Sequence, residues 1–280
     1  MHIGVIGNGF VGKATRLLEC DKIKILSYDK NPECCNPLGT TLDDLLECSI
    51  IFVSVPTPMN KDGSCHLGII ESVLDDLQNI NYNGYIVLRS TVPPGTADKL
   101  NCYFMPEFLT EKNFEYDFIH NKDWVFGLLG NQQDEDFKKN ITELFTLAYD
   151  ESKIRHNTVH FLTNSEAELV KMFKNCYLAT KVAFCNEMYS YCEKKGICYE
   201  NVRKVAANDD RILHGHTKVP GHDGKRGYGG TCFPKDTNSM LDEMKKTNTD
   251  CPIMESVVYR NENIDRQEKD WSQNKGRSVL

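Results

Sequence analysis

The sequence lacks the features that would tie the protein to a membrane or to nucleic acid. No stretch of the 280 residues approaches the ~18 unbroken apolar residues of a transmembrane helix. The first residues, MHIGVIGNGFVGKA, lack the basic start and cleavage site of a signal peptide. Lysine and arginine number 33 against 40 acidic residues, and the net charge of −7 disfavours a general nucleic-acid-binding surface. We therefore expect a cytoplasmic protein with neither membrane nor nucleic acid as a partner.

Cysteine pairs at metal-binding spacing are also missing. The twelve cysteines include no CxxC pair, so we expect no structural zinc site. His214, His216 and His222 lie in one glycine-rich stretch, but no cysteine or acidic residue completes a ligand spacing, which favours a solvated loop. In a chain with no secretion signal we expect reduced thiols, most of them small buried apolar side chains. We expect no bound metal.

The apolar fraction of 40% and the charged fraction of 26% are those of a globular protein, and the length corresponds to about two domains. Strand-like and helix-like segments alternate over residues 1–163, which predicts a parallel sheet with right-handed crossovers. We expect strands at 2–6, 22–28, 49–55, 85–89, 124–129 and 159–162, and helices at 10–20, 41–47, 67–77 and 134–148.

After residue 163 the sequence pattern becomes typical of helices. No proline or glycine interrupts residues 164–195, where Asn164 or Ser165 can cap a helix and Glu168 is placed for a capping box. Its apolar residues occupy more than one side, as in a helix that bridges domains or one that forms a dimer interface. Further helices are expected at 201–207, 235–246 and 252–263, and we assign 164–266 to a helical domain. Residues 267–280 are a polar tail that we expect to fray.

A glycine pattern follows the first expected strand. Residues 7–12, GNGFVG, fit G-x-G-x-x-G, and Asp29 follows the second strand. In a dinucleotide-binding turn, Gly7 would allow the tight turn, Gly9 the approach of a pyrophosphate and Gly12 close packing of the helix on the strand. The helix N-terminus offers N–H groups to the phosphates. Since Asp29 can accept hydrogen bonds from ribose hydroxyls, the pattern predicts NAD rather than NADP.

A cysteine follows a second glycine-rich run, GYGGTCFPKD at residues 227–236. Because Pro234 suits the first turn of a helix, Cys232 is expected at a helix N-terminus, where the helix dipole favours the reactive thiolate. The preceding glycines would let a ligand approach the backbone. Asp236 can return toward the thiol through a water. The alternative interpretation is one more structural cysteine.

With these motifs the sequence resembles the UDP-glucose/GDP-mannose (nucleotide-sugar) dehydrogenase family. Six motifs stand in the family's order: GNGFVG, VSVPTP at 53–58, STVPPG at 90–95, PEFLTE at 106–111, AELVKMFKNCYLATKVAFCNE at 167–187, and GYGGTCFPKD. The resemblance implies an α/β fold with a Rossmann-like NAD-binding domain, a long central helix that forms a homodimer, and a helical domain. Family members carry a third α/β domain, which we expect to be absent because the chain ends soon after Cys232.

The resemblance implies a two-step, NAD-dependent oxidation of the C6 alcohol of a nucleotide sugar, with UDP-glucose as the expected substrate. Cys232 would attack the intermediate aldehyde, and a thiohemiacetal and then a thioester would form on its sulfur. Lys171 and Asn175, four residues apart on one helical face, would lie near C6, where an ammonium can stabilise an alkoxide or act as a base. Asp236 would position the water or Lys171, and Glu107 would be the base for thioester hydrolysis.

The matching motifs carry over the remaining positions. The catalytic set is Cys232, Lys171, Asn175, Asp236, Glu107 and Thr91. The cofactor positions are Gly7, Gly9, Phe10, Val11, Gly12, Asp29, Val55, Pro56, Thr57, Ser90, Thr91 and Glu111. The substrate positions are Glu107, Phe108, Leu109, Lys171, Asn175, Arg211, Tyr228 and Gly229.

The sequence departs from the family pattern at two single residues. Lys112 stands where the family has glycine after the second glutamate of PEFLxE, and Cys34 replaces a basic residue after the ribose-binding aspartate, so we expect Lys30 to contact the cofactor instead. Two other functions stay open. One is a non-catalytic NAD-binding dimeric module, and the other is a one-step hydroxy-acid dehydrogenase, which would need neither Cys232 nor Asp236.

Overall fold

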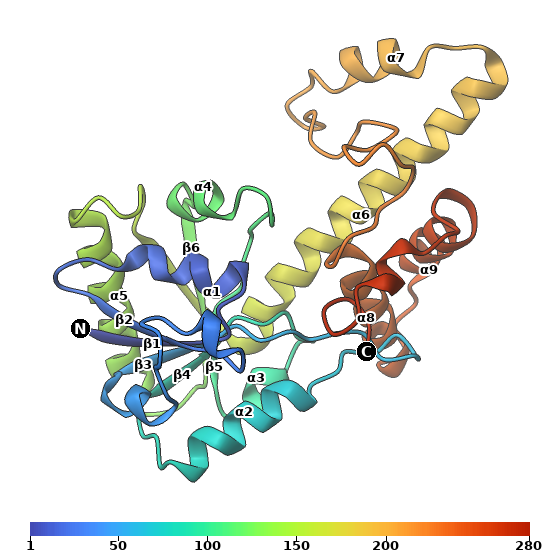
Figure 1. The fold of residues 1–280 in the computed structure, drawn as a ribbon. Coiled ribbons are helices and arrows are strands. Elements are labelled where there is room, and N and C mark those ends of the chain that lie inside the picture. The colour runs from blue at the N-terminus through green and yellow to red at the C-terminus, as the bar shows by residue number, and fades with distance from the viewer. The chain divides into compact units, whose positions relative to one another are not determined.

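A computed structural model describes residues 1–280, which form two compact units (Figure 1). Unit 1 comprises Met1–Thr57 and Leu67–Lys171, and unit 2 comprises Pro58–His66 and Met172–Leu280. The expected division at residue 163 lies a few residues before the change of unit at Lys171. The short segment 58–66 belongs to unit 2, although the residues on both sides of it in the sequence belong to unit 1. We describe each unit by itself.

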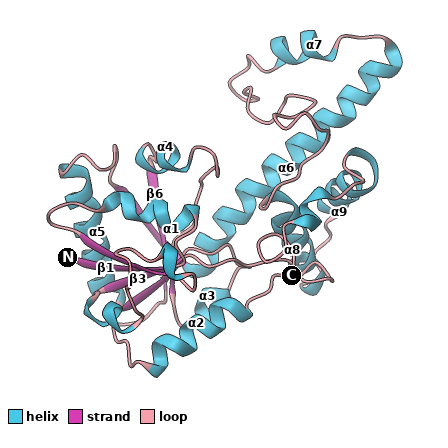
Figure 2. Ribbon diagram, in the orientation of Figure 1, coloured by secondary structure: helices cyan, strands magenta, loops and turns pink.

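A seven-stranded sheet forms the centre of unit 1 (Figure 2). The strands are β1 (His2–Ile6), β2 (Lys24–Tyr28), β3 (Ile50–Val53), β4 (Tyr85–Leu88), β5 (Tyr103–Phe104), β6 (Asp123–Leu128) and β7 (Thr158–Thr163). Their order is β2-β1-β3-β4-β5-β6-β7, and every neighbouring pair is parallel except β5 and β6. The expected α/β fold is confirmed, but the sheet is mixed at that one pair rather than purely parallel.

The register of the sheet aligns the carboxyl ends of its central strands. Ile6 of β1 pairs with Tyr28 of β2 and with Val53 of β3, and Val53 pairs in turn with Leu88 of β4. The residues that follow these strands therefore emerge at one edge of the sheet, which is where ligands bind in open α/β sheets. All four residues of β3 are buried, as expected for a strand that is covered on both faces.

Helices and short turns surround the sheet. The helices are α1 (Phe10–Thr15), α2 (Gly68–Asn79), α3 (Thr96–Lys99), α4 (Phe114–Ile119) and α5 (Asp134–Asp150), with 3-10 turns at Arg16–Leu18, Pro32–Cys34 and Asp43–Glu47. The expected helix at 10–20 is thus shorter, because it tightens into a 3-10 turn after Thr15. In α5 the buried residues Phe137, Ile141, Leu144, Phe145 and Ala148 recur at helical spacing and form one core-facing stripe.

Helix α6 (Asn164–Lys195) is continuous over 32 residues, as the sequence predicts. Its expected capping arrangement is wrong. Glu166 accepts hydrogen bonds from the backbone N–H of Thr163 (2.9 Å) and from its hydroxyl (2.8 Å), which closes the first turn. Glu168 does not take part, since its carboxylate binds a different segment of unit 1.

Unit 2 contains α7 (Tyr199–Ala206), α8 (Phe233–Lys246) and α9 (Pro252–Arg260), followed by a π-turn at Asn261–Asp265 and a 3-10 turn at Asp270–Gln273. Cys176 of α6 packs with Leu241, Met254 and Val258 of α8 and α9 in one apolar cluster. No helix is both long and apolar enough to span a membrane. No group of three or more histidine, cysteine or acidic side chains is placed to bind a metal ion.

The last residues are ordered, so the expected fraying of 267–280 is wrong. Trp271 is only 3% exposed, and Ser278 is fully buried. The backbone N–H of Met59 donates to the carbonyl of Ser278 (2.9 Å), and that of Leu280 donates to the carbonyl of Met59 (3.1 Å). A single buried tryptophan and backbone pairing to a distant segment hold a tail whose composition is polar.

Candidate active site

The glycine turn after β1 has the conformation that its sequence requires. Gly7 lies at a φ of +87°, where glycine is favoured, and a Cβ there would come within 2.7 Å of the carbonyl oxygen of Ser54. A Cβ on Gly12 would overlap the carbonyl oxygen of Gly7, so α1 can approach β1 this closely only with glycine at that position. Both glycines are therefore needed by the turn itself.

The same turn leaves room for a dinucleotide. A Cβ on Gly9 would meet nothing within 4 Å, and no side chain caps the N-terminus of α1. The carboxylate of Asp29 accepts hydrogen bonds from the backbone N–H of Asn8 (2.7 Å) and of Asn31 (2.9 Å), which holds it beside the turn. An open glycine, uncapped helical N–H groups and an acidic residue fit the pyrophosphate and ribose of a dinucleotide. Lys30 is exposed next to Asp29.

Two loops follow β3 and β4 at the same edge and are tied to each other. The hydroxyl of Ser90 donates to the carbonyl of Val55 (2.6 Å), and that of Thr57 donates to the carbonyl of Thr91 (2.8 Å). Pro56 between them is exposed. The expected cofactor positions in the VSVPTP and STVPPG motifs therefore form one hydrogen-bonded pair of loops.

A buried ion pair joins the end of unit 1 to the PEFLTE motif. Lys171 Nζ donates to Glu107 Oε1 at 2.6 Å, and both side chains are 5% exposed. Burial alone would raise the pKa of Glu107, but Lys171, the backbone N–H of Leu109 (2.8 Å) and Arg89 together hold that pKa below its ordinary value. Glu107 is therefore an ionised carboxylate. Phe108 and Leu109 are half-buried beside it, and Glu111 is exposed.

Arg89 is a functional candidate that the sequence analysis missed. It follows β4, is buried, and donates from Nη1 to the carbonyl of Val11 (3.3 Å) and to the hydroxyl of Thr15 in the glycine-turn helix. Burial lowers its pKa to about 10, which Glu107 partly opposes. An arginine at the end of an apolar strand is unusual in a core, and that contrast is the signal that could have identified it.

In unit 2, Cys232 directly precedes α8, as the sequence predicts, with Pro234 in the first turn. Its sulfur lies 3.8 Å from the hydroxyl of Thr231. Lys235 lies in the same turn; burial opposes its charge, but Asp236 and Cys232 raise its pKa above the ordinary value. The helix N-terminus and this ammonium both favour a thiolate at Cys232.

Asp236 connects this turn to α6. It is 1% exposed; one carboxylate oxygen accepts from Asn175 Nδ2 (2.5 Å) and the other from Lys235 Nζ (2.5 Å). Both oxygens of Asp236 are thus engaged by protein groups, whereas the sequence predicts that it reaches toward the thiol through a water. The carboxylate fixes Asn175, and Lys171 precedes Asn175 by one helical turn in the sequence of α6.

The glycines before Cys232 are packed against the protein rather than open to a ligand. A Cβ on Gly227 would come too close to the side-chain oxygen of Asn261, and one on Gly229 would come within 2.6 Å of Arg266. Only at Gly230 would it meet nothing within 4 Å. The Tyr228 side chain is buried beside Ala179, Ala183 and Val257, and its backbone N–H and carbonyl are both hydrogen-bonded to Asn261. Tyr228 is therefore engaged by the protein, whereas the resemblance implies a substrate contact there.

The structure gathers the expected site residues in two sets, one in each unit. The first, in unit 1, comprises the glycine turn, Asp29, the two loops, Glu107 and Lys171; the second, in unit 2, comprises Cys232, Asn175 and Asp236. Arg211 joins neither set: its side chain is 89% exposed and pairs with Asp209. Phe10 and Val11 are half-buried in the first turn of α1.

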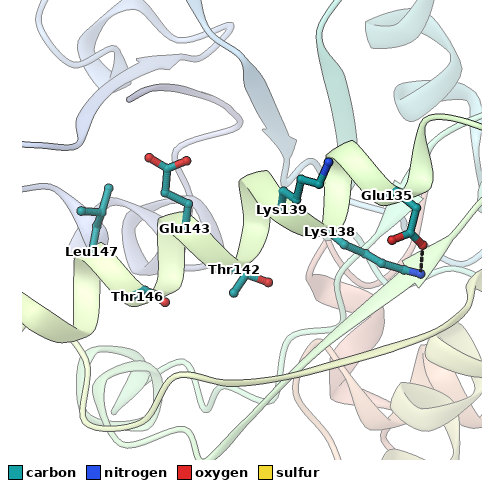
Figure 3. A pocket seen from close by; sticks show the side chains of 7 residues that line it. All are labelled: Glu135, Lys138, Lys139, Thr142, Glu143, Thr146 and Leu147. Carbon is teal, nitrogen blue, oxygen red and sulfur yellow. Dashed lines mark hydrogen bonds and ion pairs between the residues drawn. The ribbon is translucent and has the colours of Figure 1, made fainter.

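A shallow hollow beside α5 contains none of these residues (Figure 3). It is lined by Glu135, Lys138, Lys139, Thr142, Glu143, Thr146 and Leu147, all on one helix. Lys138 pairs with Glu135 on the same helix at 2.7 Å. This is the pattern of a solvated helical face, and we assign it no function.

Comparisons with known proteins identify both halves of the chain. Residues 38–149 match the NAD binding domain of the UDP-glucose/GDP-mannose dehydrogenase family, and residues 165–263 match its central domain. A putative UDP-glucose 6-dehydrogenase of Bacillus subtilis is 32% identical over 77% of this chain and 51% of its own length. The UDP-glucose 6-dehydrogenase of Rickettsia prowazekii is 30% identical over 93% of this chain and 67% of its own length.

Solved structures share the fold. A UDP-glucose dehydrogenase from Pyrobaculum islandicum superposes with a TM-score of 0.78 at 23% identity, over 93% of this chain and 68% of that one. A 3-hydroxyisobutyrate dehydrogenase of Mycobacterium tuberculosis superposes with a TM-score of 0.69 at 14% identity, over 92% and 91%. This chain spans about half to two thirds of the curated relatives that it matches. The cofactor is NAD, and the chain belongs to the UDP-glucose/GDP-mannose dehydrogenase family.

Proposed function

We propose that the protein oxidises the C6 alcohol of a nucleotide sugar twice, to a carboxylate, and that UDP-glucose is this sugar. The observation that carries the proposal is Cys232 at the N-terminus of α8, one turn before a buried Asp236 that binds Asn175. A one-step hydroxy-acid dehydrogenase needs neither the thiol nor this aspartate. The relatives named UDP-glucose 6-dehydrogenase support the choice of sugar.

In the first oxidation the C6 hydroxyl loses its proton to water and C6 loses a hydride. Bound NAD supplies the hydride acceptor. The ammonium of Lys171 stabilises the developing alkoxide, and Asn175 orients the oxygen through its amide. Glu107 keeps Lys171 charged, since the two form an ion pair that is shielded from water. The product of this step is an aldehyde.

In the second oxidation the Cys232 thiolate attacks the aldehyde carbon and forms a thiohemiacetal. Loss of a second hydride from that carbon gives a thioester on the sulfur. Glu107, which is ionised, then removes a proton from water, and the hydroxide breaks the carbon–sulfur bond. Each sugar therefore consumes two NAD and one water, and the thiolate is regenerated.

The test is the stoichiometry of NADH. Incubation with UDP-glucose and NAD should yield two NADH per sugar, and Cys232→Ala should form no uronate. Cys198→Ala is the matched control, because Cys198 is exposed and precedes α7 rather than α8. Nucleotide sugars with other bases and N-acetyl groups would be screened in parallel, with and without cell extract. No NADH from any of them, with NAD binding intact, would indicate the non-catalytic module instead.

We further propose a homodimer formed through α6. Six large apolar side chains on this helix are exposed, and they recur at steps of three or four residues when Thr180 is included: Leu169, Phe173, Tyr177, Phe184, Met188 and Tyr191. Such spacing places them on one face, and an exposed apolar stripe of this extent favours association with another chain.

A cytoplasmic location is also part of the proposal, because the Cys232 nucleophile requires a compartment that keeps thiols reduced.

A further inference from the structure

Glu168 is a buried acid that the reaction above does not use. It is fully buried, and its two carboxylate oxygens accept hydrogen bonds from the backbone N–H groups of Gly95 (2.5 Å) and Ala97 (2.7 Å). Burial raises its pKa to about 7, although both hydrogen bonds act in the opposite direction. A buried carboxyl group is costly, so an apolar residue would serve better if this position only filled space.

Both hydrogen bonds go to one segment, residues 90–97, which comprises the loop after β4 and the first two residues of α3; we refer to this segment as the loop at 90–97. Gly95 lies at a φ of +85° and directly precedes α3. At its other end the loop is fixed by Ser90 and Thr91, which are bonded to Val55 and Thr57. The loop that carries two expected cofactor positions is therefore held at one end by the neighbouring loop and at the other by Glu168.

Residues of α6 on either side of Glu168 also bind unit 1. Asn164, one turn before Glu168, donates to Asp98 (2.7 Å) and to the carbonyl of Cys102 (2.9 Å). Lys171, three residues after Glu168, binds Glu107. Residues separated by three or four positions share a helical face. One face of α6 therefore contacts residues 95–102 of unit 1 through Asn164 and Glu168, and Glu107 through Lys171.

We propose that Glu168 is a positioning residue: it fixes the position of the loop at 90–97 relative to Lys171. The inference rests on the proposed function, in which Lys171 acts at the reacting carbon, and on the family resemblance, which implies that the cofactor positions Ser90 and Thr91 lie beside the nicotinamide. Through Glu168, the loop that receives the nicotinamide and the helix that carries the lysine are attached within one helical turn. The site keeps a buried carboxylate here because only an acceptor with two oxygens can bind both N–H groups.

The test compares two ligands that differ in the nicotinamide. In Glu168→Gln the side chain keeps its shape, but its NH₂ group faces one of the two N–H donors and one hydrogen bond is lost. We expect the dissociation constant for NAD to rise about tenfold, while that for ADP-ribose, which has no nicotinamide, stays within twofold. Glu166→Gln is the matched control, because Glu166 is exposed and closes only the first turn of α6.

An equal loss for both ligands, or no loss for either, would overturn the proposal, since a merely structural residue does not distinguish them. If Glu168→Gln unfolds, Glu168→Asp keeps the charge but shortens the reach, and the same selective loss of NAD binding is expected. The readout is coenzyme binding rather than turnover. A failure to oxidise any nucleotide sugar therefore counts against the proposed function and leaves this result unaffected.

Discussion

Gly9 and Gly12 lie in the same turn, but an added methyl group would meet different surroundings at each. At Gly12 it would overlap the Gly7 carbonyl, whereas at Gly9 it would meet no protein atom within 4 Å. We expect Gly12→Ala to lower the free energy of unfolding by about 1–3 kcal/mol, the usual cost of overpacking. Gly9→Ala should leave stability unchanged but weaken NAD binding at least tenfold, because its methyl group occupies the space for the pyrophosphate.

Thermal melts and NAD titrations of the two variants separate these effects. Gly215→Ala is the control, because an added methyl group there also meets nothing within 4 Å and the position, like Gly9 and Gly12, does not lie at a positive φ. Unchanged NAD affinity in Gly9→Ala would show that the coenzyme does not approach the turn as argued.

Asn261 supports the loop that leads to Cys232. It is buried, accepts from the backbone N–H of Tyr228 (2.7 Å) and donates to its carbonyl (2.9 Å). Asn261→Ala would leave both groups unpaired, each at roughly 1–3 kcal/mol, so we expect a loss of about 2–6 kcal/mol in the free energy of unfolding measured by chemical denaturation. Asn263→Ala, at an exposed position two residues on, should change stability by less than about 0.5 kcal/mol. Equal effects of the two variants would contradict this role.

The role of a single residue can be predicted from the sequence when its contacts are local, and not when its partners are distant in the chain. Gly7, Gly12 and Cys232 are predictable because the reasons for them lie within a few positions, in a turn or at a helix start. The glycines at 227 and 229 were attributed to a ligand, but their partners are Asn261 and Arg266, more than thirty residues later. The local sequence likewise predicts a cap for Glu168, but its partners Gly95 and Ala97 lie about seventy residues earlier in the chain.

At the scale of elements, long periodic segments were the most predictable. The bounds of α6 follow from the absence of glycine and proline and from the glycine that ends it. Strand β5 has only two residues, and α3 and α4 have four and six, which is too short for a periodic pattern to appear. The antiparallel pair β5–β6 was missed because it depends on this short strand.

The C-terminal segment gives a prediction for pH. A hydrogen bond from Arg266, helped by Lys225, lowers the pKa of Asp270 to about 2 from 3.8. A lowered pKa in the folded state means that this stabilisation is complete above pH 4 and is lost as the pH falls toward 2. In a Trp124→Phe background, the fluorescence of buried Trp271 should therefore shift to the red over that range.

Asp270→Asn in the same background mimics the protonated state, so its Trp271 emission should already be shifted at higher pH. Lys138 and Glu135 form an exposed pair in unit 1, and Glu135→Gln is a control that should leave the Trp271 transition in place. A transition that is identical with and without the Asp270 carboxylate would exclude it as the cause.

At the scale of the whole molecule, the exposed stripe of α6 predicts the state in solution. Sedimentation should give twice the chain mass of 31.9 kDa. Charges placed on the stripe by Tyr177→Glu with Phe184→Glu should return the mass to 31.9 kDa, because a buried unpaired charge opposes association. Val205→Glu, at an exposed apolar position on α7, is the matched control. A wild-type protein that sediments at 31.9 kDa would contradict the dimer.

The pairing of Met59 with Ser278 and Leu280 has a consequence for synthesis. On the ribosome, the segment 58–66 emerges well before residues 278–280, with which its backbone pairs. Unit 2 therefore cannot complete its fold until residues 278–280 have emerged, whereas β1 to β4 can pair as they emerge. A stalled chain that stops before residue 278 should therefore remain sensitive to protease at residues 58–66.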